Sequence, residues 1–364
     1  MQTLFAYQQA KISNFNIALE KIGEIFRPKL NTIEIQDPNK LKSQKEEASK
    51  LFKENYKNLN GKVTASDDEV NKVTEEVIKE YHQHLKKDFI YARNLMLKQV
   101  DEIPKTYYAI LYLFSILSNF EIQDKHKKNS LVKNLLIIKI KEDNPLQSLI
   151  LKLQISWEAY LDQVNIWYKA IKKSVKYQEY SSKEEHGFDE DKDLVTFIVR
   201  EVIFKDEVSK DFWEEYDINW AENKAIVKSM VSKSIKETKE EGELVITEIS
   251  YNWEEDKTFF DLLFTISVEE ESKFEEEIVR KLKNWDIERI AITDRAIILM
   301  AMTEFTNFPS IPVKVTINEY IEISKKYSTP KSKQFVNGIL DVLSKDLESE
   351  GLIKKSGRGL IDNK

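Results

Sequence analysis

Residues that interrupt helices are rare in this chain, which has 8 glycines and 7 prolines among 364 residues. Inside a helix, glycine costs about 1 kcal/mol and proline about 3 kcal/mol relative to alanine. Lysine, glutamate, leucine and isoleucine dominate the rest of the sequence. No sustained alternation of apolar and polar residues flanked by turn residues is present, so we predict no sheet. The sequence therefore predicts an all-α fold.

Apolar residues recur at helical spacing along most of the chain, separated by short polar breaks. The first predicted helix has an apolar face that includes Leu4, Tyr7 and Ile12, and Pro28 ends it. Polar breaks are expected at 29–45 and 58–68. The further helices that we predict before the acidic segment at 181–192 lie at residues 68–100, 104–120 and 145–177.

Two helix start signals lie close together near the C-terminus. Pro312 fits a first helical position, because its missing N–H needs no partner there. Thr329 is a good N-cap and Pro330 a good first residue for a second helix. Gly338 falls inside that second helix, where it costs stability. We expect close approach of another backbone or of a ligand to compensate for it.

A basic patch accompanies these helix starts. Its cations are Lys325, Lys326, Lys331 and Lys333, and no aspartate or glutamate occurs from Ser324 to Asn337. Cations are unfavourable in the first turn of a helix, which is already positive because of its free N–H groups. The arrangement is reasonable if an anion docks at the start of the second helix.

This C-terminal segment resembles the signature of the NusB family of bacterial transcription antitermination factors. The segment Asn284-Trp285-Asp286, the helix from Asp294 to Ala301 and the opening Gln2–Tyr7 are also similar to that family. The middle of the chain and the phrase 327–332 look like the enlarged NusB proteins of the Bacteroidetes-type lineage. The motifs that carry the resemblance most strongly are Pro312-Val313-Lys314-Val315, Ile317-Asn318-Glu319 and Phe335-Val336-Asn337-Gly338-Ile339-Leu340-Asp341.

The resemblance implies an all-α, NusB-like domain of two small perpendicular helical bundles, with a large helical insertion after the first helix. We expect residues 1–30 to form the first helix, which packs onto the C-terminal bundle. Residues 31–190 would be the lineage-specific insertion, and residues 191–364 the NusB-like domain that binds RNA and protein.

Similar proteins bind boxA-type RNA, a single-stranded element, together with NusE, a small-subunit ribosomal protein, in the RNA polymerase antitermination complex. Single strands are held by phosphate contacts, base stacking and contacts to base edges. Phe335 could stack on a base or belong to the core, and Asn337 could contact a base edge or cap a backbone group. The RNA-binding residues that the resemblance implies are Gln2, Lys331, Ser332, Lys333, Gln334, Phe335 and Asn337.

The surface implied for NusE combines the first helix with the helix that follows residue 290. Phe5 would be an aromatic anchor and Asp294 a charged partner, with Tyr7 and Arg295 as further candidates. Core packing is the open alternative for Phe5. For Asp294 the alternative is an acid that complements a helix N-terminus.

Family members carry an arginine-rich segment just before the motif Gln-x-Leu-(Tyr/Phe). This chain begins inside that motif at Met1-Gln2, and its first arginine is Arg27. Three explanations are open: a start codon assigned too late, truncation, or weakened RNA binding. We favour the first. As written, the chain is expected to bind RNA less tightly than a full family member.

Composition argues against several other functions. A net charge of −7 confines RNA binding to a local patch. Without cysteine the chain has no thiolate chemistry and no disulfide, which suits a cytoplasmic protein. His82 and His84 lie two residues apart and do not share a helical face, so we expect no metal site.

Neither a P-loop nor G-x-G-x-x-G occurs, and we expect no enzyme and no cofactor. NusB-like domains also precede some rRNA methyltransferases, but nothing here resembles their methyl-donor domain. The leading hypothesis is an antitermination factor that supports transcription of rRNA operons. The alternative is a NusB-derived scaffold for protein interactions, with RNA binding weakened or lost.

Overall fold

The computed structural model describes residues 1–29, 36–59, 64–124, 130–281 and 290–361. Every regular element within these ranges is a helix, which confirms the predicted all-α class. The predicted motif Asn284-Trp285-Asp286 lies outside the described residues.

The chain divides into two compact units, of which the first joins residues 1–97 to 257–364 and the second contains residues 98–256. This division differs from the predicted boundary between residues 190 and 191, which falls inside helix α9 (Phe188–Ile198). Leu194 and Val195 of that helix are fully buried in the core of the second unit. Separating α9 from that unit would expose them to water.

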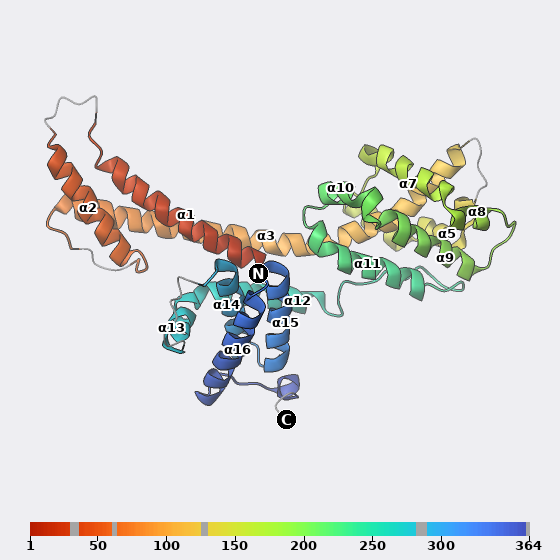
Figure 1. The fold of residues 1–364 in the computed structure, drawn as a ribbon. Helices are drawn as coiled ribbons and strands as arrows, with labels where there is room; N and C mark the ends of the chain where they lie inside the picture. The colour runs from red at the N-terminus through yellow and green to blue at the C-terminus, as the bar shows by residue number, and fades with distance from the viewer. Residues whose placement is uncertain (30–35, 60–63, 125–129, 282–289, 362–364) are drawn as a thin grey trace. The chain divides into compact units, whose positions relative to one another are not determined.

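The C-terminal part of the first unit is a helical bundle built around α14 (Ile292–Asn307). Residues 296–305 of α14 are buried on all sides, as expected for a helix that its neighbours surround. Leu4 and Tyr7 from the start of α1 (Gln2–Ile25) belong to the same buried core. The N-terminus of the chain accordingly lies beside this bundle (Figure 1). The other helices of the bundle are α12 (Trp253–Glu269), α13 (Glu271–Lys281), α15 (Val313–Tyr327) and α16 (Ser332–Ser349), followed by the short η4 (Gly357–Leu360).

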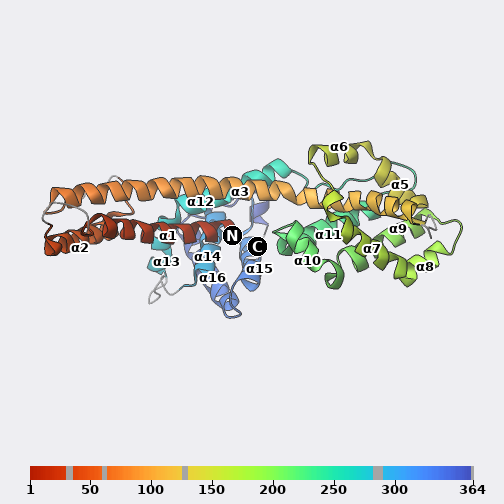
Figure 2. The ribbon, with the colours of Figure 1, turned by 90° about the horizontal axis from the view of Figure 1, so that it is seen from above.

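The N-terminal part of the first unit is a three-helix arm. It consists of α1, α2 (Pro38–Asn55) and the beginning of α3 (Asp68–Gln123). Helices α1 and α3 run antiparallel and side by side (Figure 2), and the pairs Lys21–Glu80 and Asn14–Asp88 join them. Ile22, Phe52, Val70 and Val77 form the centre of the core of this arm.

Two helix boundaries differ from the sequence prediction. Helix α2 begins at Pro38, inside a predicted polar break, because Asp37 caps Asn39 N at 2.9 Å and Pro38 fits the first turn. Helix α3 runs through Pro104, where two helices were predicted. Buried side chains before and after Pro104 hold both halves in place, which offsets the lost backbone hydrogen bond. None of the described helices is long and apolar enough to span a membrane.

The second unit is organised around a cluster of tryptophans. Trp157, Trp167 and Trp213 are buried, and their indole N–H groups donate to Ala109 O, Ser209 Oγ and Ile203 O. Pairing these donors allows the large rings to be buried without an unsatisfied polar group. The elements of this unit after α3 are α4 (Ser130–Lys133), α5 (Leu135–Glu142), α6 (Asn144–Lys152), η1 (Glu158–Tyr160), α7 (Leu161–Lys173), α8 (Val175–Ser181), α9, the π-helical η2 (Val199–Ile203), α10 (Asp206–Tyr216) and α11 (Trp220–Glu237).

Candidate nucleic-acid and partner interface

A small hydroxyl network fixes the start of α16. Ser332 N donates to Thr329 O at 2.9 Å, and the two side-chain oxygens of these residues are 2.8 Å apart. Ser328 Oγ lies 2.9 Å from Ser332 Oγ and donates to the Asp294 carboxylate at the start of α14. The ends of α14, α15 and α16 are therefore tied together at one place.

The helix itself begins at Ser332, two residues later than predicted. Thr329 and Pro330 form the turn, Lys331 occupies the N-cap position, and no side chain caps the first turn. The first turn also carries no acid. The positive end of the α16 dipole is thus compensated by no acidic residue of its own first turn.

The basic patch separates into paired and unpaired lysines. Lys325 forms an ion pair with Glu322, and Lys326 Nζ lies 5.2 Å from the centre of the Tyr327 ring. Lys331 and Lys333 are exposed, and within the described part of the chain neither has an ion-pair partner. These two lysines are therefore the cations that an external anion can reach with least competition.

One face of α16 continues the exposed surface from these lysines. Lys333, Gln334, Asn337 and Gly338 are all exposed, at helical spacing. A Cβ at Gly338 would meet no atom within 4 Å, so the predicted approach of another backbone of this chain is wrong. The other predicted reason for this glycine, a ligand, stays a prediction.

Two of the other RNA-binding candidates on α16 turn inward. Ser332 is only 5% exposed and belongs to the hydroxyl network. Phe335 is half-buried and packs against the bundle core, which favours the structural alternative for its ring. Gln2 is exposed at the beginning of α1, and it takes no part in the hydroxyl network at the start of α16.

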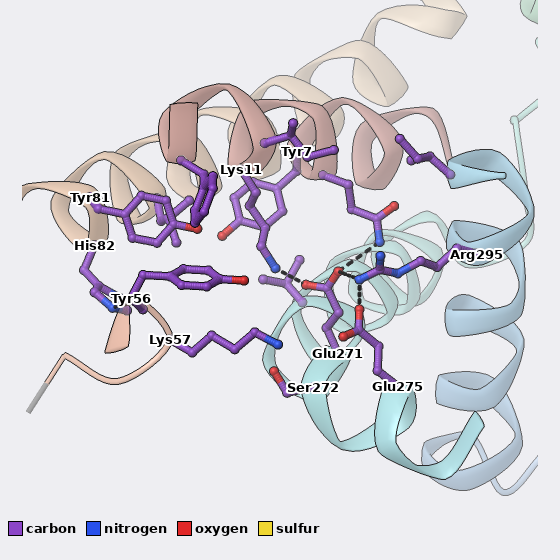
Figure 3. A pocket seen from close by; sticks show the side chains of 16 residues that line it. Tyr7, Lys11, Tyr56, Lys57, Tyr81, His82, Glu271, Ser272, Glu275 and Arg295 are labelled. Carbon is purple, nitrogen blue, oxygen red and sulfur yellow. Dashed lines mark hydrogen bonds and ion pairs between the residues drawn. The ribbon is translucent and has the colours of Figure 1, made fainter. Parts of the chain in front are cut away.

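The four candidates for the protein-partner surface occupy different environments. Phe5 is half-buried, whereas Tyr7 is buried and burial raises its pKa to about 12. Asp294 is only 4% exposed and accepts from Ser328, so its described role is to join helix ends. Arg295 pairs with Glu275 and lies 3.6 Å from Glu271. Tyr7 and Arg295 line the same cavity (Figure 3).

A buried carboxyl group holds α15 against α14. Glu304 accepts hydrogen bonds from Thr316 Oγ1 at 2.6 Å and from Tyr320 OH at 3.1 Å. Burial raises the pKa of Glu304, although both hydrogen bonds act in the opposite direction. Lys355 donates to the backbone oxygens of Glu304 and Phe308, at 3.2 and 3.0 Å. This network supports the helix pair that precedes the basic turn.

Sequence reasoning did not predict the cavity, although it named Tyr7 and Arg295 as candidates for a different site. Its ionic side joins Lys11 on α1 to Glu271 on α13, which is 260 residues away in the sequence. No local pattern links residues so far apart. Within the described ranges, no group of three or more histidine, cysteine, aspartate or glutamate residues could hold a metal ion.

Comparison with known proteins identifies the bundle. The model of the NusB family matches residues 216–345. Proteins named transcription antitermination protein NusB are similar to the chain: 43% identity over 105 residues in Salinibacter ruber, 47% over 85 in Chloroherpeton thalassium, and 37% over 97 in Koribacter versatilis. No solved structure matches the chain.

These alignments are partial on both sides. They cover 29%, 23% and 27% of this chain, and 66%, 40% and 66% of the three relatives. The matched residues include the helices α14, α15 and α16 that carry the exposed lysines and the hydroxyl network. The part of this match that lies in the first unit, residues 257–345, belongs to the helical bundle and is called the NusB-family domain below.

Proposed function

We propose that this chain is an RNA-binding transcription antitermination factor, and that the start of α16 contacts single-stranded RNA of the boxA type. The observation that carries the proposal is the pair Lys331 and Lys333. Both are exposed and lack an ion-pair partner within the described residues, at an uncapped helix start inside the NusB-family domain. A helix start of this kind attracts phosphate groups.

The exposed face of α16 provides contacts beyond charge. Gln334 and Asn337 carry amide groups that can donate to and accept from base edges. Gly338 adds no side chain to this face, so a strand can approach the helix backbone closely. The phosphates would then lie on Lys331 and Lys333, with the bases along the next turn.

The proposed partner is NusE, which the resemblance to the NusB family implies. Two of the relatives are named transcription antitermination protein NusB, which supports this choice. Binding of RNA and of NusE would be coupled, so that each strengthens the other by the same factor. Through this assembly the chain would support transcription of rRNA operons. The proposal involves no chemical step.

A charge reversal tests the RNA surface. The double variant Lys331→Glu with Lys333→Glu should weaken binding of a labelled boxA-type RNA in fluorescence anisotropy. Each phosphate contact on single-stranded RNA contributes about 0.7 to the slope of log K against log salt. Loss of two contacts should therefore make that slope shallower by about 1.4.

The matched control is Lys50→Glu with Lys53→Glu. Both lysines are exposed on α2, so the control changes the net charge by the same amount at another surface. If affinity and salt slope stay unchanged in the α16 variant, or if both variants lose affinity equally, then α16 is not the RNA surface.

A further inference from the structure

The first unit contains a cavity of about 480 Å³ where the three-helix arm meets the NusB-family domain. Small-molecule sites in proteins have volumes of roughly 300–1,000 Å³. The arm contributes α1, the residues after α2, and α3, whereas the family domain contributes α12, α13 and the start of α14. The cavity therefore depends on residues inside the family match and on residues outside it.

One side of the cavity is aromatic. Phe15, Tyr56 and Tyr81 pack against one another, with ring centres 4.8 Å apart for Phe15 and Tyr56 and 5.7 Å apart for Tyr56 and Tyr81. Phe15 and Tyr56 are half-buried. His82 Nε2 donates to Tyr56 O at 2.9 Å, which holds the backbone of this wall in place. The wall is preformed and suits a flat ring.

The opposite side is ionic, and its carboxylates are already compensated. Glu271 is buried, pairs with Lys11, and accepts from Gln8 Nε2 at 3.1 Å. Arg295 pairs with Glu275 and lies close to Glu271 (Figure 3). Because every acid on this side has a basic partner, the side has no uncompensated negative charge to attract a cation.

The positive charge without a partner is that of Lys57. Its side chain reaches from the aromatic side toward Ser272 (Figure 3), and no ion pair of Lys57 occurs within the described ranges. Counting Lys11, Lys57 and Arg295 against Glu271 and Glu275 leaves one net positive charge in the cavity. The charge of the lining thus favours an anion.

Apart from Glu275 Oε1, which forms an ion pair with Arg295, two buried polar atoms of the lining have no hydrogen-bond partner among the described residues. Gln8 is 5% exposed, and its Oε1 accepts no hydrogen bond from any described residue. Arg295 Nε likewise donates to none. Buried polar groups are nearly always paired, so an unpaired acceptor and donor at the same cavity suit a ligand that carries both functions.

We propose that this cavity binds a nucleoside phosphate. Its base would lie against the Phe15 and Tyr56 rings. The edge of the base would donate a hydrogen bond to Gln8 Oε1 and accept one from Arg295 Nε. Its phosphate would be bound by Lys57 and Ser272. A nucleoside phosphate combines a flat ring, a ring edge that carries hydrogen-bond donors and acceptors, and a negative charge. The site is separate from the α16 surface proposed for RNA.

Isothermal titration calorimetry of the full chain tests the site. The probes are adenosine, guanosine, cytidine and uridine 5′-monophosphates, with unphosphorylated adenosine and inorganic phosphate as partial ligands. At least one monophosphate should bind with a 1:1 ratio and more tightly than adenosine or phosphate alone. The proposal is overturned if no monophosphate binds at millimolar concentration, or if phosphate alone binds as tightly.

Variants locate the binding. Lys57→Ala should weaken binding about tenfold by removing a charge-assisted contact, and Tyr56→Leu about tenfold by removing a stacking surface. Lys53→Ala, on the exposed face of α2 near the same chain segment, should leave affinity unchanged. A Lys57→Ala variant that binds like the parent chain contradicts the site.

A third variant separates this site from the RNA surface. Lys331→Glu with Lys333→Glu should retain monophosphate binding, because neither lysine lines the cavity. If that variant loses monophosphate binding while Lys57→Ala keeps it, then the nucleotide occupies the α16 surface and the cavity proposal fails. Loss of RNA binding with retained monophosphate binding supports both assignments independently.

Discussion

The hydrogen bond from Thr316 to Glu304 offers a sharp test of how the family domain is held together. Replacing Thr316 by valine keeps the side-chain shape and removes the hydroxyl that lies 2.6 Å from the Glu304 carboxylate. Thr316 is fully buried, so water does not replace the lost donor without rearrangement. A hydrogen bond to a charged group contributes about 1.5–3 kcal/mol. We expect Thr316→Val to destabilise the contact between α14 and α15 by that amount.

The assay must report on the first unit. Five of the six tryptophans lie in residues 98–256, so intrinsic fluorescence would report mainly on the second unit. Hydrogen–deuterium exchange of peptides from α14 and α15 measures the relevant opening directly. A loss of about 1.5–3 kcal/mol corresponds to exchange that is about 10- to 150-fold faster in these peptides.

A double-mutant cycle separates the hydrogen bond from general packing. In a Glu304→Gln background the acceptor is neutral, and Thr316→Val should cost only about 0.5–1.5 kcal/mol. Equal costs in both backgrounds would show that the Glu304 charge does not strengthen this bond. Unchanged exchange in the single variant would refute the network as described.

Two further predictions concern the same domain. Because burial raises the folded-state pKa of Glu304 above its unfolded value, its contribution to stability is complete below the unfolded pKa and is lost as pH rises through the folded pKa. Glu304→Gln should therefore gain stability relative to the parent chain as pH increases from 4 to 8 in thermal unfolding, and a relative loss would contradict this sign. Gly338→Ala should stabilise α16 by about 0.5–1 kcal/mol, since no atom lies within 4 Å of the new Cβ, yet weaken RNA binding in anisotropy. Tighter or unchanged RNA binding would show that no strand approaches Gly338.

Local patterns were sufficient to predict the helical class. Scarce glycine and proline predict α1 correctly, and Leu4 and Tyr7 of its predicted apolar face are buried. Ile12, which was predicted on the same face, is 47% exposed. The predicted polar break at 29–45 ends too late, because Asp37 and Pro38 start a helix within it. The prediction of two helices separated near Pro104 was wrong, because α3 continues through this proline. The penalty of a proline inside a helix is a local quantity, whereas the burial on both sides of it depends on the folded structure.

The candidate site was predictable only where charge and exposure decide it. The acid-free run around Lys331 and Lys333 is visible in the sequence, and both lysines are exposed. The buried positions of Ser332 and Asp294 could not be predicted, because they depend on Ser328, which connects the two residues across three helix ends. The cavity requires contacts between residues about 260 positions apart, which no periodicity encodes.

The most direct test of the proposed function is a titration of labelled boxA-type RNA with this chain, with and without purified NusE, over a salt series. We expect NusE to tighten RNA binding, and the affinity of the complex to fall as salt increases. The reciprocal titration, with NusE labelled, should show the same factor of tightening by RNA. RNA affinity that is independent of both NusE and salt, or no RNA binding at all, would contradict the proposal.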